Sequence, residues 1–97
     1  MKTTNYLNPE DYKLLQNFPN PFNPKTQIKY EIKKQSQVTI KVFNILGVEI
    51  ETLVESKQQP GSYKIEFDGS NISSGVYFYS LYIDDIPVDT KKMILIR

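Results

Sequence analysis

The sequence has no cysteine and no histidine in its 97 residues. Their absence excludes disulfides, thiolate and imidazole metal ligands, and nucleophilic catalysis that relies on a Cys-His pair or a Ser-His-Asp triad. It does not decide the compartment, because domains without cysteine can fold outside the cytoplasm on their hydrophobic cores alone. Much of enzyme chemistry is therefore closed to this chain.

Long hydrophobic runs are also absent. No apolar stretch approaches the roughly 20 residues that span a bilayer, so we expect no transmembrane segment. The N-terminus, "MKTTNYLNPEDYKLL", lacks the apolar core of a secretory signal peptide. We expect the chain to be either cytoplasmic or a piece of a larger protein.

Neither sign of charge dominates. The 12 Lys and Arg residues nearly balance the 11 Asp and Glu residues, and neither group is clustered, so we expect no nucleic-acid or anionic-membrane partner. A chain of 97 residues with 39% hydrophobic content is long enough for one core and too short for two. The polar, weakly patterned residues 1–13 indicate a linker or mobile arm, which leaves residues 14–97 as the folded domain.

From Thr26 onward, apolar residues alternate with polar ones, as in a half-buried strand. The alternation predicts that Ile28, Tyr30 and Ile32 point inward. In the next strand, inward Val38, Ile40 and Val42 would alternate with outward Thr39 and Lys41.

Turn signals separate the strands. Gly47 suits a turn or bulge, Pro60-Gly61 a type II turn, and Asp84-Asp85 a tight connection. Residues 76–83 are apolar on both faces, which predicts a central strand, whereas Pro87 argues for an edge. The last strand would cover residues 90–97. The sequence thus predicts an all-β, immunoglobulin-like antiparallel β-sandwich of six to seven short strands.

Few side chains suggest chemistry. Asp68, Asp84 and Asp85 are better explained as turn residues than as ligands, because a calcium site needs six to eight converging oxygens. Asn71 begins a glycosylation acceptor pattern that occurs often by chance. We therefore predict no catalytic residue, no metal site and no cofactor, and we predict that the chain is not an enzyme.

Aromatic residues leave an alternative open. Tyr63, Tyr77 and Tyr79 could form a flat platform for sugar rings, or they could fill the space between the sheets, which the strand preference of aromatics favours. The platform would require exposed, coplanar rings.

Four motifs resemble, in order and spacing, the type A C-terminal sorting domain of the type IX (Por) secretion system, over residues 14–97. They are "NFPNPFNPKTQIKYEI", "VTIKVFNILGVEIETLV", "PGSYKIEFDGSNISSGVYFYSL" and "KKMILIR". The resemblance implies the tail of a large exported protein. Such a cargo crosses the inner membrane on its own signal peptide, passes the periplasm, and is recognised by the outer-membrane translocon. A surface sortase then anchors it at the cell surface or releases it.

The resemblance also implies roles for individual residues. Phe67 stands where the family often has tryptophan, which should repack the core only. The residues implied in translocon recognition are Lys91, Lys92, Met93, Ile94, Leu95, Ile96 and Arg97, on a terminal strand able to add to a partner's sheet. The residues implied in the shared fold are Pro19, Asn20, Pro21, Phe22, Asn23, Pro24, Gly47, Gly61, Gly75, Val76 and Tyr77.

The proline-rich stretch "NFPNPFNP" invites its own interpretation. Its prolines would set an extended path and block stray strand pairing, while Phe18 and Phe22 would pin that path to the sandwich. Two other functions remain open at this point: an accessory immunoglobulin-like module of a secreted enzyme, either carbohydrate-binding or a spacer, and a self-associating structural sandwich.

Overall fold

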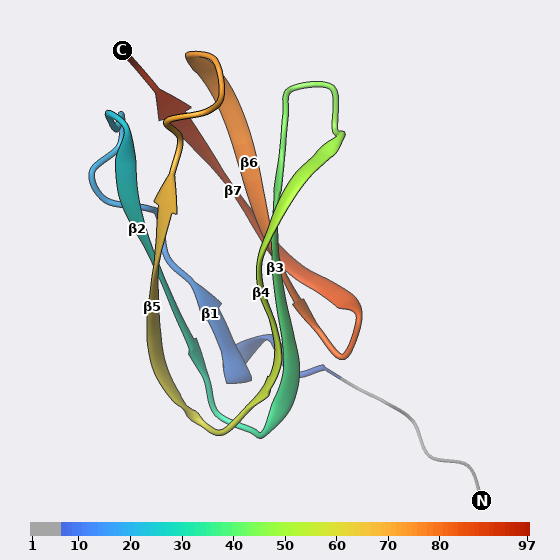
Figure 1. Ribbon diagram of the computed structural model, residues 1–97. Coiled ribbons are helices and arrows are strands. Elements are labelled where there is room, and N and C mark those ends of the chain that lie inside the picture. Colours follow the sequence, from blue (N-terminus) through green and yellow to red (C-terminus); the bar gives the residue numbers. More distant parts are fainter. Residues whose placement is uncertain (1–6) are drawn as a thin grey trace, which may run out of the picture.

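The computed structural model, which describes residues 7–97, consists of two antiparallel sheets packed face to face (Figure 1). One sheet has the strand order β1-β2-β5 and the other the order β4-β3-β6-β7. After a short 3-10 turn, η1 (Pro9–Asp11), the strands are β1 (Tyr12–Leu14), β2 (Lys25–Ile32), β3 (Ser36–Phe43), β4 (Glu49–Gln58), β5 (Gly61–Asp68), β6 (Gly75–Ile83) and β7 (Ile86–Leu95). This confirms the all-β sandwich.

The core lies between the sheets and follows from the alternation. In β2, buried and exposed residues alternate along the whole strand. The same pattern buries Val38, Ile40 and Val42 in β3. Thr39 alternates with these residues and faces outward as expected, but it is buried because it lies between Tyr82 of β6 and Glu55 of β4. The fully or nearly buried hydrophobic side chains are Leu14, Phe22, Ile28, Tyr30, Ile32, Val38, Ile40, Val42, Val54, Phe67, Tyr77, Tyr79, Leu81, Ile83, Met93 and Leu95.

The connections between strands are of two kinds. Gly47, with φ at +81°, closes the β3–β4 hairpin, and its N–H donates to the Asn44 carbonyl at 2.9 Å. Asp84 and Asp85 both have positive φ, at 51° and 69°, which is the pattern of a type I′ turn between β6 and β7. The expected turn and tight connection are therefore present.

The segment around Pro60 is different. It crosses from β4 in one sheet to β5 in the other, as the β2–β3 segment also does in the opposite direction. Gly61 has φ at +158°, whereas the third position of a type II turn requires about +80°. The predicted type II turn is therefore wrong, because the chain must change sheets here rather than fold back.

Two further expectations are corrected at the chain ends. Residues 12 and 13, predicted as linker, lie in β1, because Tyr12 and Lys13 pair with β2 and Leu14 buries its side chain. The two strands predicted over residues 86–88 and 90–97 are one strand, β7, which ends at Leu95 and leaves Ile96 and Arg97 outside it. An irregularity between Leu81 and Tyr82 in the β6–β7 pairing absorbs the extra residue. The edge position of Pro87 and the central position of β6 are confirmed.

Candidate functional site

The last seven residues divide between the core and the surface. Met93 and Leu95 are 0% and 1% exposed and pack between the sheets. Lys91 and Ile94 are half-buried. The exposed members of the group implied in recognition are Lys92, Ile96 and Arg97. The strand period explains this division, because alternate side chains of β7 point toward and away from the opposite sheet.

The outer edge of β7 is covered by the chain itself. We call residues 16–22 the cover segment. The Phe22 N–H donates to the Ile94 carbonyl at 2.9 Å, and the Ile96 N–H donates to the Phe22 carbonyl at 2.9 Å. The Asn20 side chain accepts from the Ile94 N–H at 2.9 Å, and Gln16 Nε2 donates to the Lys92 carbonyl at 2.6 Å. The backbone of residues 92–96 is therefore not open to strand addition.

Within the proline-rich stretch, the two phenylalanines differ. Phe22 is 1% exposed and meets Phe67 edge to face, with ring centroids 6.0 Å apart. Phe18 is 79% exposed, although its backbone pairs with Gln27. The expectation that both rings pin the segment is therefore wrong for Phe18.

The predicted extended path is also wrong. Residues 19–21, 23 and 24 form bends between isolated bridges, and the peptide bonds before Pro19, Pro21 and Pro24 are cis. Nor do the prolines prevent all pairing, since the chain pairs through Phe22 with β7. Asn23 is exposed and lies between these bends.

A buried polar contact holds the start of this stretch. Asn17, 2% exposed, donates from Nδ2 to Thr26 Oγ1 at 3.0 Å and to the Pro19 carbonyl at 3.1 Å. Thr26 Oγ1 donates to the same carbonyl at 2.7 Å. Because each buried polar atom has a partner, the contact fixes the bend without leaving an unpaired group.

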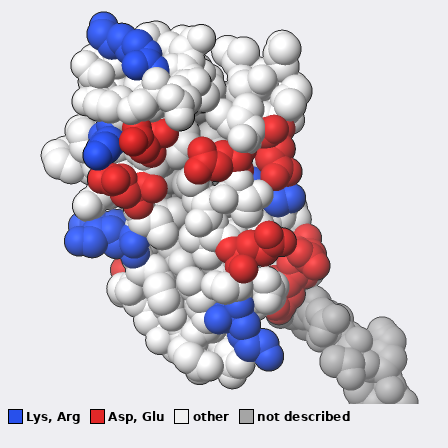
Figure 2. Space-filling model, viewed as in Figure 1, with Lys and Arg blue, Asp and Glu red and all other residues white. Residues whose placement is uncertain are grey.

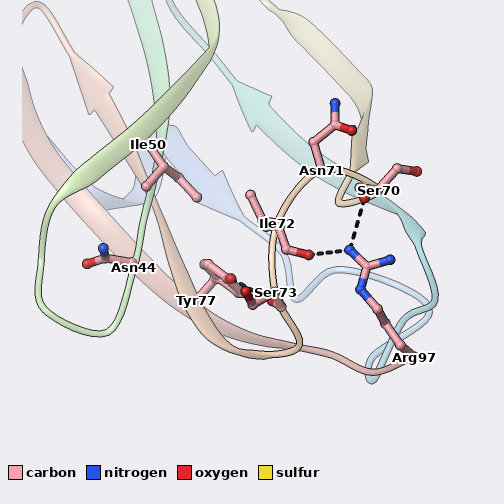
Figure 3. A pocket seen from close by; sticks show the side chains of 8 residues that line it. All are labelled: Asn44, Ile50, Ser70, Asn71, Ile72, Ser73, Tyr77 and Arg97. Atoms are coloured by element: carbon pink, nitrogen blue, oxygen red, sulfur yellow. Dashed lines mark hydrogen bonds between the residues drawn. The ribbon is translucent and has the colours of Figure 1, made fainter.

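Arg97 fastens the C-terminal end of the chain to the loop between β5 and β6. Its guanidinium donates to the carbonyls of Gly69 and Ser70, at 2.8 and 3.0 Å, and to that of Ile72 (Figure 3). Beside it, an open hollow of about 540 Å³ is lined by Asn44, Ile50, Ser70, Asn71, Ile72, Ser73, Tyr77 and Arg97. The residues that line this hollow come from the β3–β4 hairpin, the loop before β6 and the C-terminal end of the chain.

Gly69 is a structural residue that sequence reasoning passed over as part of a turn. A Cβ at this position would lie 3.0 Å from Leu95 Cδ2 and 3.3 Å from the Pro24 carbonyl. Its N–H donates to that carbonyl at 2.8 Å. A side chain at this position would crowd Leu95 and the Pro24 carbonyl, so glycine suits this close approach between the loop, the proline-rich stretch and β7.

Two acidic turn residues accept hydrogen bonds from the protein itself, Asp68 within its own loop and Asp84 from the neighbouring strand β3. Asp68 Oδ1 accepts from the side chain and the backbone N–H of Ser70, and these two hydrogen bonds lower the pKa of the Asp68 carboxyl. Asp84 Oδ1 accepts from the Gln37 N–H at 3.0 Å. Among residues 7–97, no group of three or more acidic side chains is arranged to hold a metal ion.

The remaining fold-motif residues lie around β6. Gly75 begins the strand with φ at +153°, Val76 is half-buried, and Tyr77 is 8% exposed with its hydroxyl donating to the Ser73 carbonyl at 2.6 Å. Tyr79 is fully buried; its hydroxyl donates to the Leu15 carbonyl at 2.7 Å, and burial raises its pKa to about 12. Since two of the three tyrosines are buried, the exposed aromatic platform is contradicted.

On the face drawn in Figure 2, acidic and basic side chains of the described residues are interspersed. Residues 7–97 include no helix with the length and apolarity needed to cross a bilayer. The molecule is thus an immunoglobulin-like sandwich whose last strand is both part of the core and covered at its outer edge.

Sequence comparison identifies the family. Residues 16–96 match the model of the secretion system C-terminal sorting domain, and the chain belongs to this family. Family membership makes it a type IX secretion sorting signal, a non-catalytic class of domain found on proteins that are exported to the cell surface or secreted. It also implies interaction with the type IX machinery and an attached cargo.

Other comparisons add the fold alone. No curated protein matches the chain by sequence. Among solved structures, the Pseudomonas fluorescens alkylpurine DNA glycosylase AlkC, bound to DNA containing an abasic site analog, matches with a TM-score of 0.65 at 10% identity. The match covers 90% of this chain and 31% of the glycosylase, so the chain spans about a third of that protein's length.

Proposed function

We propose that residues 14–97 are the tail of a longer exported protein and that the type IX translocon recognises the folded C-terminal end of this tail. The cargo would cross the inner membrane on its own signal peptide, pass the periplasm, and leave through the outer membrane. A surface sortase would then remove the domain and anchor or release the cargo. Family membership supports the sorting role, and the structure supports the choice of surface.

The observation that carries this proposal is the division of residues 91–97 between core and surface. Met93 and Leu95 hold the strand in the core, so Lys92, Ile96 and Arg97 are presented at a fixed place on the sandwich. The cover segment occupies the outer backbone edge of residues 92–96, so a partner would contact the exposed side chains there instead of pairing with the strand backbone. Recognition would therefore require the folded domain.

The division of residues 91–97 between core and surface also determines which variants can test the proposal. Deleting residues 92–97 would remove Met93 and Leu95 from the core, and burial of each contributes roughly 1.5–3 kcal/mol. A secretion defect in such a deletion would not separate lost recognition from lost folding. Substitutions confined to exposed side chains leave the core intact. Because Arg97 also donates to loop carbonyls, the stability of the variant must be measured beside its secretion.

A reporter fused to residues 14–97 behind a signal peptide is expressed in a bacterium with the type IX machinery. The test variant carries Lys92→Ala, Ile96→Ser and Arg97→Ala. The matched control carries Lys33→Ala, Lys57→Ala and Ile86→Ser, which are exposed residues of the same kinds at the opposite end of the sandwich.

We expect the control to reach the surface like the parent and the test variant to accumulate inside the cell. Urea unfolding of both purified domains checks that the fold is kept. Equal surface display of the two folded variants would refute recognition through these side chains.

A further inference from the structure

Each sheet has two edge strands, and three of these four edges are protected against pairing with another chain. β7 is covered over residues 92–96. β1 is only 3 residues long. β4 has two register irregularities and carries Glu49, Glu51 and Glu55, and both bulges and charges discourage edge pairing. β5 also carries exposed charges, but Lys64 and Glu66 are of opposite sign, and its eight residues pair with β2 in unbroken register without a bulge.

The backbone groups that β5 turns outward can be identified from β2. Gln27 exchanges both of its backbone hydrogen bonds with Phe18, at 3.0 Å each, so Gln27 faces away from β5. Directions alternate along a strand, so Ile28 faces β5, and its partner Ile65 faces β2. The residues that alternate with Ile65 turn their N–H and C=O groups outward, and among the described strands β5 pairs with β2 alone. These residues are Ser62, Lys64, Glu66 and Asp68.

The charges along this edge are unbalanced within one molecule. Lys64 lies directly opposite Lys29 of β2, and like charges in such a pair destabilise a sheet. Glu66 lies opposite the neutral Gln27. Both Lys64 and Glu66 are exposed. An added strand with an acidic residue beside Lys64 and a basic residue beside Glu66 would offset these charges.

We propose that the partner of this edge is a second copy of the chain, with the two β5 strands antiparallel and Ile65 opposite Ile65. This register places Lys64 of each copy opposite Glu66 of the other. It also extends the inner face by placing Tyr63 opposite Phe67, an aromatic cross-strand pair. The two three-stranded sheets then become one continuous sheet about a two-fold axis.

Charge selects this register over its neighbours. Hydrogen-bonded pairs can form only between residues that turn outward, so the strands can slip only by two residues at a time. One slip places Lys64 opposite Lys64, and the slip in the other direction places Glu66 opposite Glu66. The second slip also sets Lys64 of each copy opposite Asp68 of the other, but each of the two slips leaves one like-charge pair at its centre. The proposed register forms two Lys64–Glu66 pairs and no like-charge pair.

The association is expected to be weak. Each of the two Lys64–Glu66 pairs exchanges two backbone hydrogen bonds. A contact along one strand buries less than about 1,200 Å², which is the range of transient complexes, so we expect a Kd on the order of 100 μM. The dimer would therefore form where chains are concentrated. It does not depend on the sorting function proposed above.

Charge exchange tests the proposal. Sedimentation equilibrium of residues 1–97, from about 10 μM to about 1 mM, spans the expected Kd. Lys64→Glu and Glu66→Lys each place like charges opposite one another and should weaken self-association about tenfold or more. An equimolar mixture of these two variants should associate like the parent chain, and so should the double variant Lys64→Glu/Glu66→Lys.

The matched control is Lys57→Glu on β4, which should leave the association unchanged. Recovery in the mixture would also show that both single variants are folded, because only folded β5 edges can pair in register. A parent chain that stays monomeric at about 1 mM would overturn the proposal. Single variants that associate as strongly as the parent, or a mixture that fails to recover, would overturn it equally.

Discussion

Replacing Phe22 by alanine tests how the proline-rich stretch is attached to the domain. Phe22 is 1% exposed, packs edge to face against Phe67 with an interplanar angle of 66°, and exchanges backbone hydrogen bonds with β7. Phe18, four residues earlier, has the same side chain but is 79% exposed. The two positions form a matched pair in which burial is the main difference.

The expected magnitude follows from burial. Truncating a buried phenylalanine to alanine costs about 3–5 kcal/mol, which combines the lost transfer free energy with that of the cavity left behind. About 0.5–1.5 kcal/mol of this would come from the aromatic contact with Phe67. Phe18→Ala should change the free energy of unfolding by less than about 0.5 kcal/mol. Because small domains are stable by about 5–15 kcal/mol, Phe22→Ala removes a large share of the total.

Urea unfolding followed by circular dichroism and tyrosine fluorescence measures both variants. The chain contains no tryptophan, so its 7 tyrosines provide the fluorescence signal. In a thermal scan, Phe22→Ala should lower Tm by at least about 12 °C, while Phe18→Ala should leave it nearly unchanged. If the two variants unfold within about 1 kcal/mol of each other, Phe22 is not the anchor and the reasoning from burial fails.

Three other predictions test individual features. Asp85→Gly should stabilise the chain by about 0.5 kcal/mol, since glycine suits the second centre of a type I′ turn; an unchanged or lower urea midpoint would contradict this. Gly69→Ala should destabilise it by about 1–3 kcal/mol, because the new methyl group would crowd Leu95, and an unchanged midpoint would show that the loop simply moves. The raised pKa of Tyr79, about 12 against its ordinary 10.0, means that the unfolded chain loses this proton first, so the Tyr79 contribution to the unfolding free energy should be constant below about pH 10 and fall from about pH 10 to 12. Tyr79→Phe should reduce this fall, leaving a smaller one from Tyr30, whose pKa burial also raises; an equal fall in both chains would refute the assignment.

The strand positions could be predicted because burial on one face leaves a two-residue period in the sequence. Ile28, Tyr30 and Ile32 lie inward as expected. The period indicates which face of a strand is buried, but not which strand lies beside it. The chain changes sheets after Ile32, at Pro60 and after Asp68, and the pattern does not show at any of these crossings which sheet the next strand joins. The type II turn was wrongly predicted at Pro60 because the pattern does not show that the chain changes sheets there.

The cover of β7 could not be predicted at all. Its hydrogen bonds join Phe22 to Ile94 and Ile96 through backbone groups, which nearly every residue type possesses. The same limit applies to Phe18 and Phe22, because two identical side chains in one motif differ only in where the bends direct them. Gly69 was similarly hidden, since its role depends on contacts with Pro24 and Leu95 that are distant in sequence.

The arrangement of the C-terminal strand has a consequence for how such a signal can be read. Hydrogen bonds from the cover segment take up the outer backbone edge of residues 92–96, and the core takes up Met93 and Leu95. A partner is left with side chains on a rigid surface, held by Arg97 against the loop before β6. An isolated peptide of the same sequence would lack both constraints and pay the ordering entropy on binding. The proposed recognition therefore depends on folding, so a variant of this strand is informative about recognition only when its stability has been measured alongside.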